Sequence, residues 1–221
     1  MTVPEGEEAL QKKWHSVYAS DALSRRRKKT HLRKLEKIGL FELPRTVKLL
    51  DVACGEGEML DLMAEAGFTD LTGLDPFEPS RNRTSRWKFV KGSGGKLPFP
   101  DNDFDLILCA HALHHFSGVD EIKQFLIESE RVLRPGGRFF IIDHYDSLQL
   151  SVVHFLLMSP LAKLGPWTSA FHDQLCSERK ELDAYVKHYP EVRRAILEAP
   201  FSAEPLRQDF FFFYFEGRKK S

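Results

Sequence analysis

The sequence has few cysteines, no net charge and no long hydrophobic run. The three cysteines are widely spaced and form no CxxC pair, which argues against a disulfide framework or a zinc site and favours a reducing, cytoplasmic compartment. The 32 basic and 32 acidic side chains cancel, so no overall field draws the chain to nucleic acid or a membrane surface. The longest apolar stretch, 148–161, is interrupted and too short to span a bilayer. The polar first ten residues predict no secretory signal.

Short apolar runs alternate with helical patterns from residue 47 onward. Strands are expected at 47–52, 71–74, 87–91, 104–110 and 138–142. Helices are expected at 58–66 and, from apolar residues at helical spacing, from Val119 to Leu133. These alternations predict an α/β fold with a mostly parallel sheet and helices on both faces.

The flanking segments divide the chain further. Residues 1–43 are predicted to be helical, and their basic run, 25–37, is interpreted as a solvated helix face. Residues 44–146 form the α/β core. Residues 147–200 are mostly helical, with breaks at prolines, and are expected to form a lid over the carboxyl ends of the strands. Residues 201–221 add a closing strand pair, in which the aromatic run 210–215 predicts a strand buried on both faces.

A small-residue turn follows the first strand. The segment Leu49–Gly57 runs from an apolar strand through Asp51 into a tight loop, and the second strand ends at Asp75. Glycine lets a ligand approach the backbone, and an acid at the tip of the next strand accepts hydrogen bonds from a ribose diol. This layout predicts a nucleoside cofactor at the carboxyl ends of the strands.

Four motifs in order identify a resemblance. They are Leu50–Gly57, Gly73–Asp75, Leu97–Asp105 and Arg131–Gly137. The chain resembles the class I S-adenosylmethionine-dependent methyltransferases, above all the small-molecule branch related to ubiquinone and menaquinone biosynthesis. The resemblance implies a Rossmann-like seven-stranded sheet whose last strand is antiparallel. It also implies S-adenosylmethionine as the cofactor and S-adenosylhomocysteine as the product.

The resemblance assigns the cofactor-binding residues. Asp51, Gly55 and Gly57 would line the methionine end, Asp75 would hold the ribose hydroxyls, and the backbone near Ala110 and His111 would meet the methionine amino group. The complete expected set is Asp51, Ala53, Gly55, Gly57, Asp75, Pro76, Ser93, Gly94, Ala110 and His111.

Two positions depart from the family pattern. Ala53 stands where the family usually has glycine, and Ser93 stands where it typically has an aspartate that accepts from the adenine amino group. A hydroxyl accepts without charge assistance, so the backbone of Gly94 would share adenine recognition.

Histidines supply the candidate catalytic residues. His111 and His115 follow the fourth strand, and His144 follows the fifth, where the acceptor is expected. Each could act as a general base toward a phenol or thiol, although direct displacement from a sulfonium does not require one. A His111–His115 metal pair would need a helix, and no metal is expected. In the loop after His144, Asp146 or Ser147 could instead cap the next helix.

The sequence therefore predicts methyl transfer from S-adenosylmethionine to a small-molecule acceptor, with no nucleic-acid partner. The alternative is a catalytically degenerate cofactor-binding or interaction protein, which the changes at Ala53 and Ser93 would permit. Apolar residues of the lid, including Phe155, Leu156, Met158 and Trp167, could line the acceptor pocket or pack the lid onto the sheet. Neither the acceptor nor the oligomeric state is indicated.

Overall fold

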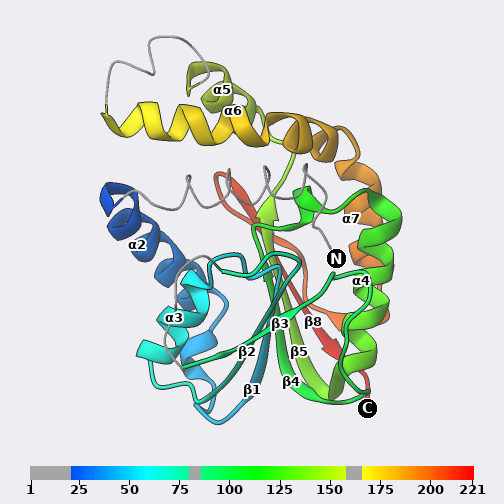
Figure 1. Cartoon of the computed structure of the whole chain (residues 1–221). Coiled ribbons are helices and arrows are strands. Elements are labelled where there is room, and N and C mark those ends of the chain that lie inside the picture. The colour runs from blue at the N-terminus through cyan, green and yellow to red at the C-terminus, as the bar shows by residue number, and fades with distance from the viewer. Residues whose placement is uncertain (1–20, 80–85, 158–165) are drawn as a thin grey trace, which may run out of the picture.

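A computed structural model describes residues 21–79, 86–157 and 166–221, in which helices surround one sheet (Figure 1). The helices are α2 (Asp21–Lys37), α3 (Glu58–Glu65), α4 (Val119–Val132), α5 (Leu148–Leu157), α6 (Pro166–Lys187) and α7 (Tyr189–Glu198), with short 3-10 helices η1 (Leu40–Glu42) and η2 (Leu113–His115). The strands are β1 (Lys48–Val52), β2 (Asp70–Asp75), β3 (Lys88–Lys91), β4 (Phe104–Ala110), β5 (Leu133–His144), β6 (Phe201–Ala203), β7 (Arg207–Gln208) and β8 (Phe212–Lys219). None of the helices in this described part is both long and apolar enough to cross a membrane.

The sheet follows the order β3-β2-β1-β4-β5-β8-β6, and β7 pairs with β8 off this path. Strands β1 to β5 are parallel, whereas β8 is antiparallel to both β5 and β6. The Rossmann-like sheet with an antiparallel last strand is confirmed, and the two-residue β7 is an addition to the expected seven. The strand order reverses between β1 and β4, and ligands of open α/β sheets bind at such a switch point.

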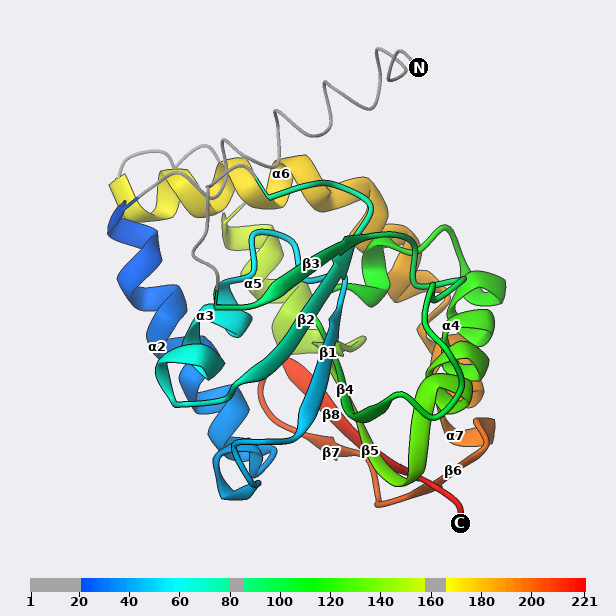
Figure 2. The same cartoon turned by 60° about the horizontal axis from the view of Figure 1, so that its bottom comes forward.

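Successive residues of the central strands face opposite helix layers. In β4, Ile107 and Cys109 join the apolar cluster that includes α4 and α7, whereas Leu106 and Leu108 join the cluster that includes α2 and α3. Figure 2 shows these helices on either side of the sheet. Because both faces are covered, the strands are continuous apolar runs, and this is the pattern that predicted them.

The aromatic run near the C-terminus is only partly a strand, so the prediction of burial throughout 210–215 was wrong at its start. Phe210 is 58% exposed and precedes β8. The Asp209 carboxylate accepts the backbone N–H groups of Phe211 and Phe212 at 3.1 and 2.9 Å, which makes a local turn. Only from Phe213 to Phe215 are the aromatic side chains fully covered.

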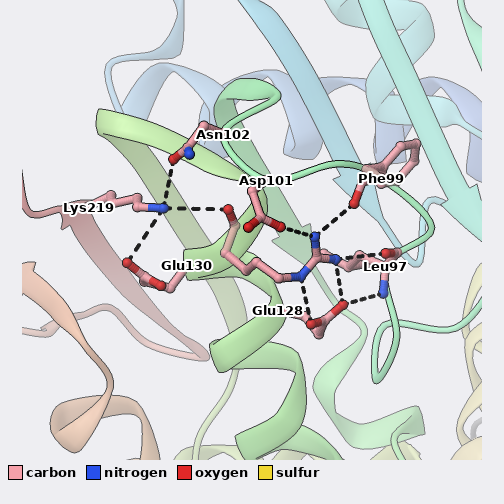
Figure 3. A network of polar contacts seen from close by, with 8 residues as sticks. Leu97, Phe99, Asp101, Asn102, Glu128, Glu130 and Lys219 are labelled. Carbon is pink, nitrogen blue, oxygen red and sulfur yellow. Dashed lines mark hydrogen bonds and ion pairs between the residues drawn. The ribbon is translucent and has the colours of Figure 1, made fainter.

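A charged network fixes the loop that enters β4. The Arg131 guanidinium donates to the carbonyl oxygens of Leu97 and Phe99 at 2.9 and 2.8 Å, and to the carboxylates of Asp101 and Glu128. Figure 3 shows these four acceptors gathered around one side chain. Arg131, in the last turn of α4, therefore holds the Leu97–Asp105 motif in place.

Candidate functional site

A cavity of about 320 Å³ lies where β1, β2 and β4 end. The register of the parallel strands pairs Asp51 with Gly73 and Val52 with Leu74, so the polar residues that follow each strand meet at one edge. Ten residues predicted for the site line this cavity: Asp51, Ala53, Gly55, Asp75, Pro76, Ser93, Gly94, Ala110, His111 and His115.

Two predicted residues, Gly57 and His144, do not line the cavity. Gly57 has φ +71°, and a Cβ there would lie 2.2 Å from the ring of Trp87, so this glycine makes room for the indole. The His144 ring packs 4.6 Å from the ring of Phe212 and 5.9 Å from that of His111, measured between centroids. It therefore lies behind His111 rather than in the cavity.

The loop after β1 takes left-handed backbone angles at Ala53, Gly55 and Gly57. A Cβ on Gly55 would meet no atom within 4 Å, so the cavity is open at this point of the backbone. Ala53 has φ +57° and accepts a conformation that costs an L-residue about 1–2 kcal/mol. The alanine is thus more than one extra methyl group, because it adds backbone strain beside the cavity.

Two buried carboxylates form the floor of the site. Asp75 is 8% exposed and accepts the backbone N–H of Gly55 at 2.9 Å and that of Phe77 at 2.9 Å. Burial raises its pKa, and these two hydrogen bonds oppose the rise. Asp51 is 3% exposed, and burial together with the charge of Asp75 raises its pKa to about 8. The floor therefore favours ligands that bring hydrogen-bond donors or positive charge.

The Ser93 hydroxyl is held between two groups. It accepts the N–H of Gly95 at 3.2 Å and donates to Glu121 at 3.0 Å. Glu121, from the first turn of α4, also lines the cavity. Burial opposes ionisation of Glu121, but hydrogen bonds from Ser117 and Ser93 outweigh it and lower the pKa. A carboxylate thus stands beside Ser93, and no motif in the sequence had indicated it.

The histidines after β4 are not on one helix. His111 has φ +58°, and only 113–115 form a 3-10 turn. Buried Asp143 accepts the N–H groups of Ala112 and Leu113 at 3.0 and 2.7 Å and pairs with His114 at 3.1 Å, which fixes this turn. Among the described residues no group of three His, Cys, Asp or Glu side chains could hold a metal ion.

Helices α2 and α6 also reach the site. Glu181 of α6 lies 2.9 Å from Nδ1 of His115, and both residues line the cavity. His31 of α2 lies 3.4 Å from Glu58, and these two line it as well. Sequence reasoning missed Glu181, His31 and Glu58, because these residues come from helices without a motif.

The burial of Lys34 contradicts the prediction that the whole basic run faces solvent. The basic run was interpreted as a solvated face, and Lys28, Lys29, Arg33 and Lys37 are indeed exposed. Lys34, however, is 5% exposed, and its Nζ lies 2.5 Å from Nε2 of His111. The sequence did indicate that Lys34 lies on the covered face of the helix, because Lys34 precedes the buried Ile38 by one helical turn.

Two of the apolar lid residues whose side chains the structure describes, Phe155 and Leu156, do not line the cavity. Phe155 and Leu156 of α5 are 78% and 59% exposed. Ser147 caps α5, since its hydroxyl accepts the N–H of Leu150 at 3.1 Å, as one interpretation of that loop had it. Met158 and the side chain of Trp167 lie outside the described residues.

Comparisons with known proteins agree with this geometry. Residues 50–141 match the family described as methyltransferase domain. The demethylmenaquinone methyltransferase of Tropheryma whipplei is 35% identical over 102 residues, which are 43% of this chain and 41% of that protein. The demethylmenaquinone methyltransferase of Listeria welshimeri is 32% identical over 128 residues, 52% of each chain. This chain thus spans about half, or less, of the length of these curated relatives.

Among solved structures, the chain is similar to 1,6-didemethyltoxoflavin-N1-methyltransferase of Burkholderia thailandensis, with a TM-score of 0.61 and 19% identity over 100% of this chain and 92% of that one. At this identity the similarity shows the fold. The agreement over whole chains means that the helical segments outside 50–141 also have counterparts in that structure.

Proposed function

We propose that the protein, whose residues 50–141 match a methyltransferase domain, is a class I S-adenosylmethionine-dependent methyltransferase that transfers a methyl group to a small-molecule acceptor by direct displacement. The domain carries the cavity's floor and glycine loop. The relatives' named acceptors are small molecules, a demethylmenaquinone and a didemethyltoxoflavin, which supports the acceptor class proposed here.

The residues around Asp75 suit the nucleoside part of S-adenosylmethionine. A carboxylate has about four acceptor positions, and in Asp75 backbone N–H groups occupy two of them. The remaining two suit the hydroxyl donors of a ribose diol. The open backbone at Gly55 gives the ligand room to approach. Ser93, Gly94 and Glu121 then face the adenine, whose amino group is a donor that the Glu121 carboxylate can accept.

The methionine end of the cofactor would face Asp51 and the turn at Ala110 and His111, which line the cavity. The N–H of His111 donates to the carbonyl oxygen of Ile142 at 2.7 Å, so this N–H is already used and a ligand would have to meet another group of the turn. An ammonium group placed there would compensate the buried charge of Asp51, whose pKa is raised by burial and by the charge of Asp75.

The acceptor side lies under the helical segments. We propose that the 147–200 segment acts as the lid, through the contact of Glu181 in α6 with His115, and that α2 of the 1–43 segment covers the cavity from the side of His31. The remaining divisions, 44–146 as the cofactor-binding core and 201–221 as the closing strands, are part of the same proposal. The three cysteines form no disulfide, which supports a reducing compartment such as the cytoplasm.

The bound sulfonium supplies the electrophilic methyl group, and the chain aligns the acceptor and excludes water. Of the three candidate bases, His111 is preferred because it lines the cavity and is neutral: burial and the nearby Lys34 hold its pKa well below the usual value. His115 is paired with Glu181, and His144 lies behind His111.

The observation that carries the proposal is Asp75, poised beside the open Gly55 backbone. Calorimetric titration with S-adenosylhomocysteine, S-adenosylmethionine and, as a control, a nicotinamide dinucleotide tests it. Micromolar binding of the first two alone is expected, followed by label transfer from methyl-labelled cofactor to members of a small-molecule panel. A folded protein that binds neither would refute the proposal. Binding without transfer to any acceptor would favour the degenerate alternative.

A further inference from the structure

Lys34 is buried and forms no ion pair with any residue in the described part of the chain. Its Nζ lies 3.5 Å from the centroid of the Phe212 ring and 2.5 Å from Nε2 of His111. Burying an ammonium group is costly unless it is paired, and such lysines readily lose their proton. Asp143 and Asp209 act on Lys34 only through their charges, and their hydrogen bonds go to other groups.

His111 connects Lys34 to the cavity. His111 lines the cavity, whereas Lys34 is not among the lining residues. The strained backbone of His111 is held by its N–H bond to Ile142, and strain of this kind concentrates at functional sites. Since Nε2 faces Lys34, Nδ1 is the ring nitrogen left for a bound molecule, and it makes no hydrogen bond to any described residue.

The contact has two protonation patterns. When Lys34 is an ammonium, it donates to Nε2, so a neutral His111 carries its proton on Nδ1 and presents a donor. When Lys34 is an amine, it accepts from Nε2–H, so Nδ1 presents a lone pair. Burial lowers the pKa of Lys34 to about 7, against the charges of Asp143 and Asp209. Burial, Lys34 and the rings of His144, His31 and His114 keep His111 neutral.

We propose that Lys34 is the positioning residue that sets which nitrogen of His111 carries the proton, and that the pair serves an acceptor with an acidic hydroxyl, a phenol or an enol. This inference rests on the proposed methyl transfer. The acceptor's O–H proton passes to Nδ1 of His111, and the Nε2 proton passes to the Lys34 amine. The acceptor oxygen bonds to the methyl carbon as the sulfur–methyl bond breaks, and that electron pair stays on sulfur. One positive charge is present before, on sulfur, and one after, on Lys34.

An acidic hydroxyl matches this base. A proton acceptor poised near neutral pH is most effective toward a group that ionises not far above that range. A simple alcohol ionises too weakly. A neutral amine acceptor can attack through its lone pair and lose an N–H proton after the methyl transfer, so it does not need a base first.

The direct test is the tautomer of His111, measured by nitrogen NMR on protein with labelled histidine, with and without saturating S-adenosylhomocysteine. The chain has nine histidines, and His111→Gln assigns the signal. In wild type the proton should move from Nδ1 to Nε2 as pH rises through about 7. Lys34→Arg, which stays charged, should hold it on Nδ1 at every pH. Lys34→Met should abolish the pH step, and Lys28→Met, an exposed change on the same helix, should leave it unchanged.

A second measurement uses 4-nitrophenol, whose phenolate is coloured, with the protein saturated in S-adenosylhomocysteine. The bound phenol should ionise at lower pH in wild type than in Lys34→Met, with a difference of about tenfold in the phenolate ratio. A His111 tautomer that ignores all Lys34 variants would overturn the role of Lys34. Equal ionisation in both proteins, or no binding of the phenol, would overturn the acceptor class. If the wild-type protein did not bind S-adenosylhomocysteine, the proposed function itself would be refuted. A failure of the Lys34 proposal can therefore be distinguished from a failure of the proposed function.

Discussion

The change Asp75→Asn tests the cofactor site most sharply, because it keeps the shape of the side chain and removes its charge. Asp75 already holds the N–H groups of Gly55 and Phe77, so the ribose hydroxyls would use the two remaining acceptor positions. An amide has one oxygen and one NH₂ group. The NH₂ group would have to face either a backbone N–H or a ribose hydroxyl, and it cannot accept from either.

The magnitude follows from these contacts. Hydrogen bonds to a charged group are worth about 1.5–3 kcal/mol each. Losing one ribose contact and the charge assistance of the other should cost about 3 kcal/mol of binding free energy. That corresponds to roughly a hundredfold weaker affinity for S-adenosylhomocysteine. Folding should change little, since the variant also removes the cost of burying the charge that raises the pKa of Asp75.

The assay is calorimetric titration with S-adenosylhomocysteine, with thermal unfolding as the check on folding. Asp70→Asn is the matched control, because Asp70 begins the same strand and does not line the cavity. It should bind with the wild-type affinity. If Asp75→Asn folds and its dissociation constant stays within about threefold of wild type, the placement of the ribose at Asp75 is wrong.

Three further predictions follow from other parts of the site. Because burial raises the pKa of Asp51 to about 8, the free protein holds a proton there that a cationic ligand must displace. The affinity for S-adenosylhomocysteine should therefore rise by up to about tenfold per pH unit from pH 6 to 8 and then level off. The variant Asp51→Asn should flatten this profile. Glu121→Gln should reduce the preference for S-adenosylhomocysteine over its inosine analogue, which lacks the amino group, by about tenfold in competition titrations. Arg131→Met should lower the free energy of unfolding by about 2 kcal/mol in urea denaturation, whereas Arg134→Met, which loses one exposed ion pair, should lower it by at most about 0.5 kcal/mol.

Each of these has an outcome that would contradict it. A flat affinity profile in wild type would show that no ammonium group meets Asp51. Undiminished discrimination in Glu121→Gln would place the adenine elsewhere. Equal losses in the two arginine variants would mean that the network in Figure 3 contributes no more than a surface pair.

The sequence was sufficient for the sheet and for the floor of the site because both depend on local patterns. Doubly covered strands are continuous apolar runs, and acids that end neighbouring parallel strands must meet at one edge. The sequence alone therefore predicted that Asp51 and Asp75 lie close together. The start of β8 could not be placed as well, because the Asp209 turn, and not aromatic content, decides where the strand begins.

The acceptor side could not be predicted in the same way. Which face of α2 is covered depends on how that helix packs against α3 and β8, and these contacts join residues far apart in the chain. Lys34 therefore looked like its exposed neighbours, although it packs on Phe212. Glu121 and Glu181 reach the cavity from helices whose sequences carry no site motif.

The cofactor side and the acceptor side of the site carry side chains of different charge, because the first would bind a cationic ligand and the second would take up a proton. The floor holds Asp51 and Asp75, whose pKa values are raised chiefly by burial, so they favour a ligand that brings positive charge. The opposite side, at His111 and Lys34, holds nitrogen bases whose pKa values burial lowers. A charged lysine there would repel a sulfonium before the reaction. A neutral lysine can receive the positive charge afterwards, so the reaction moves one charge from the ligand to this side without creating another. In this arrangement the burial of Lys34, which costs folding free energy, is the condition for its use.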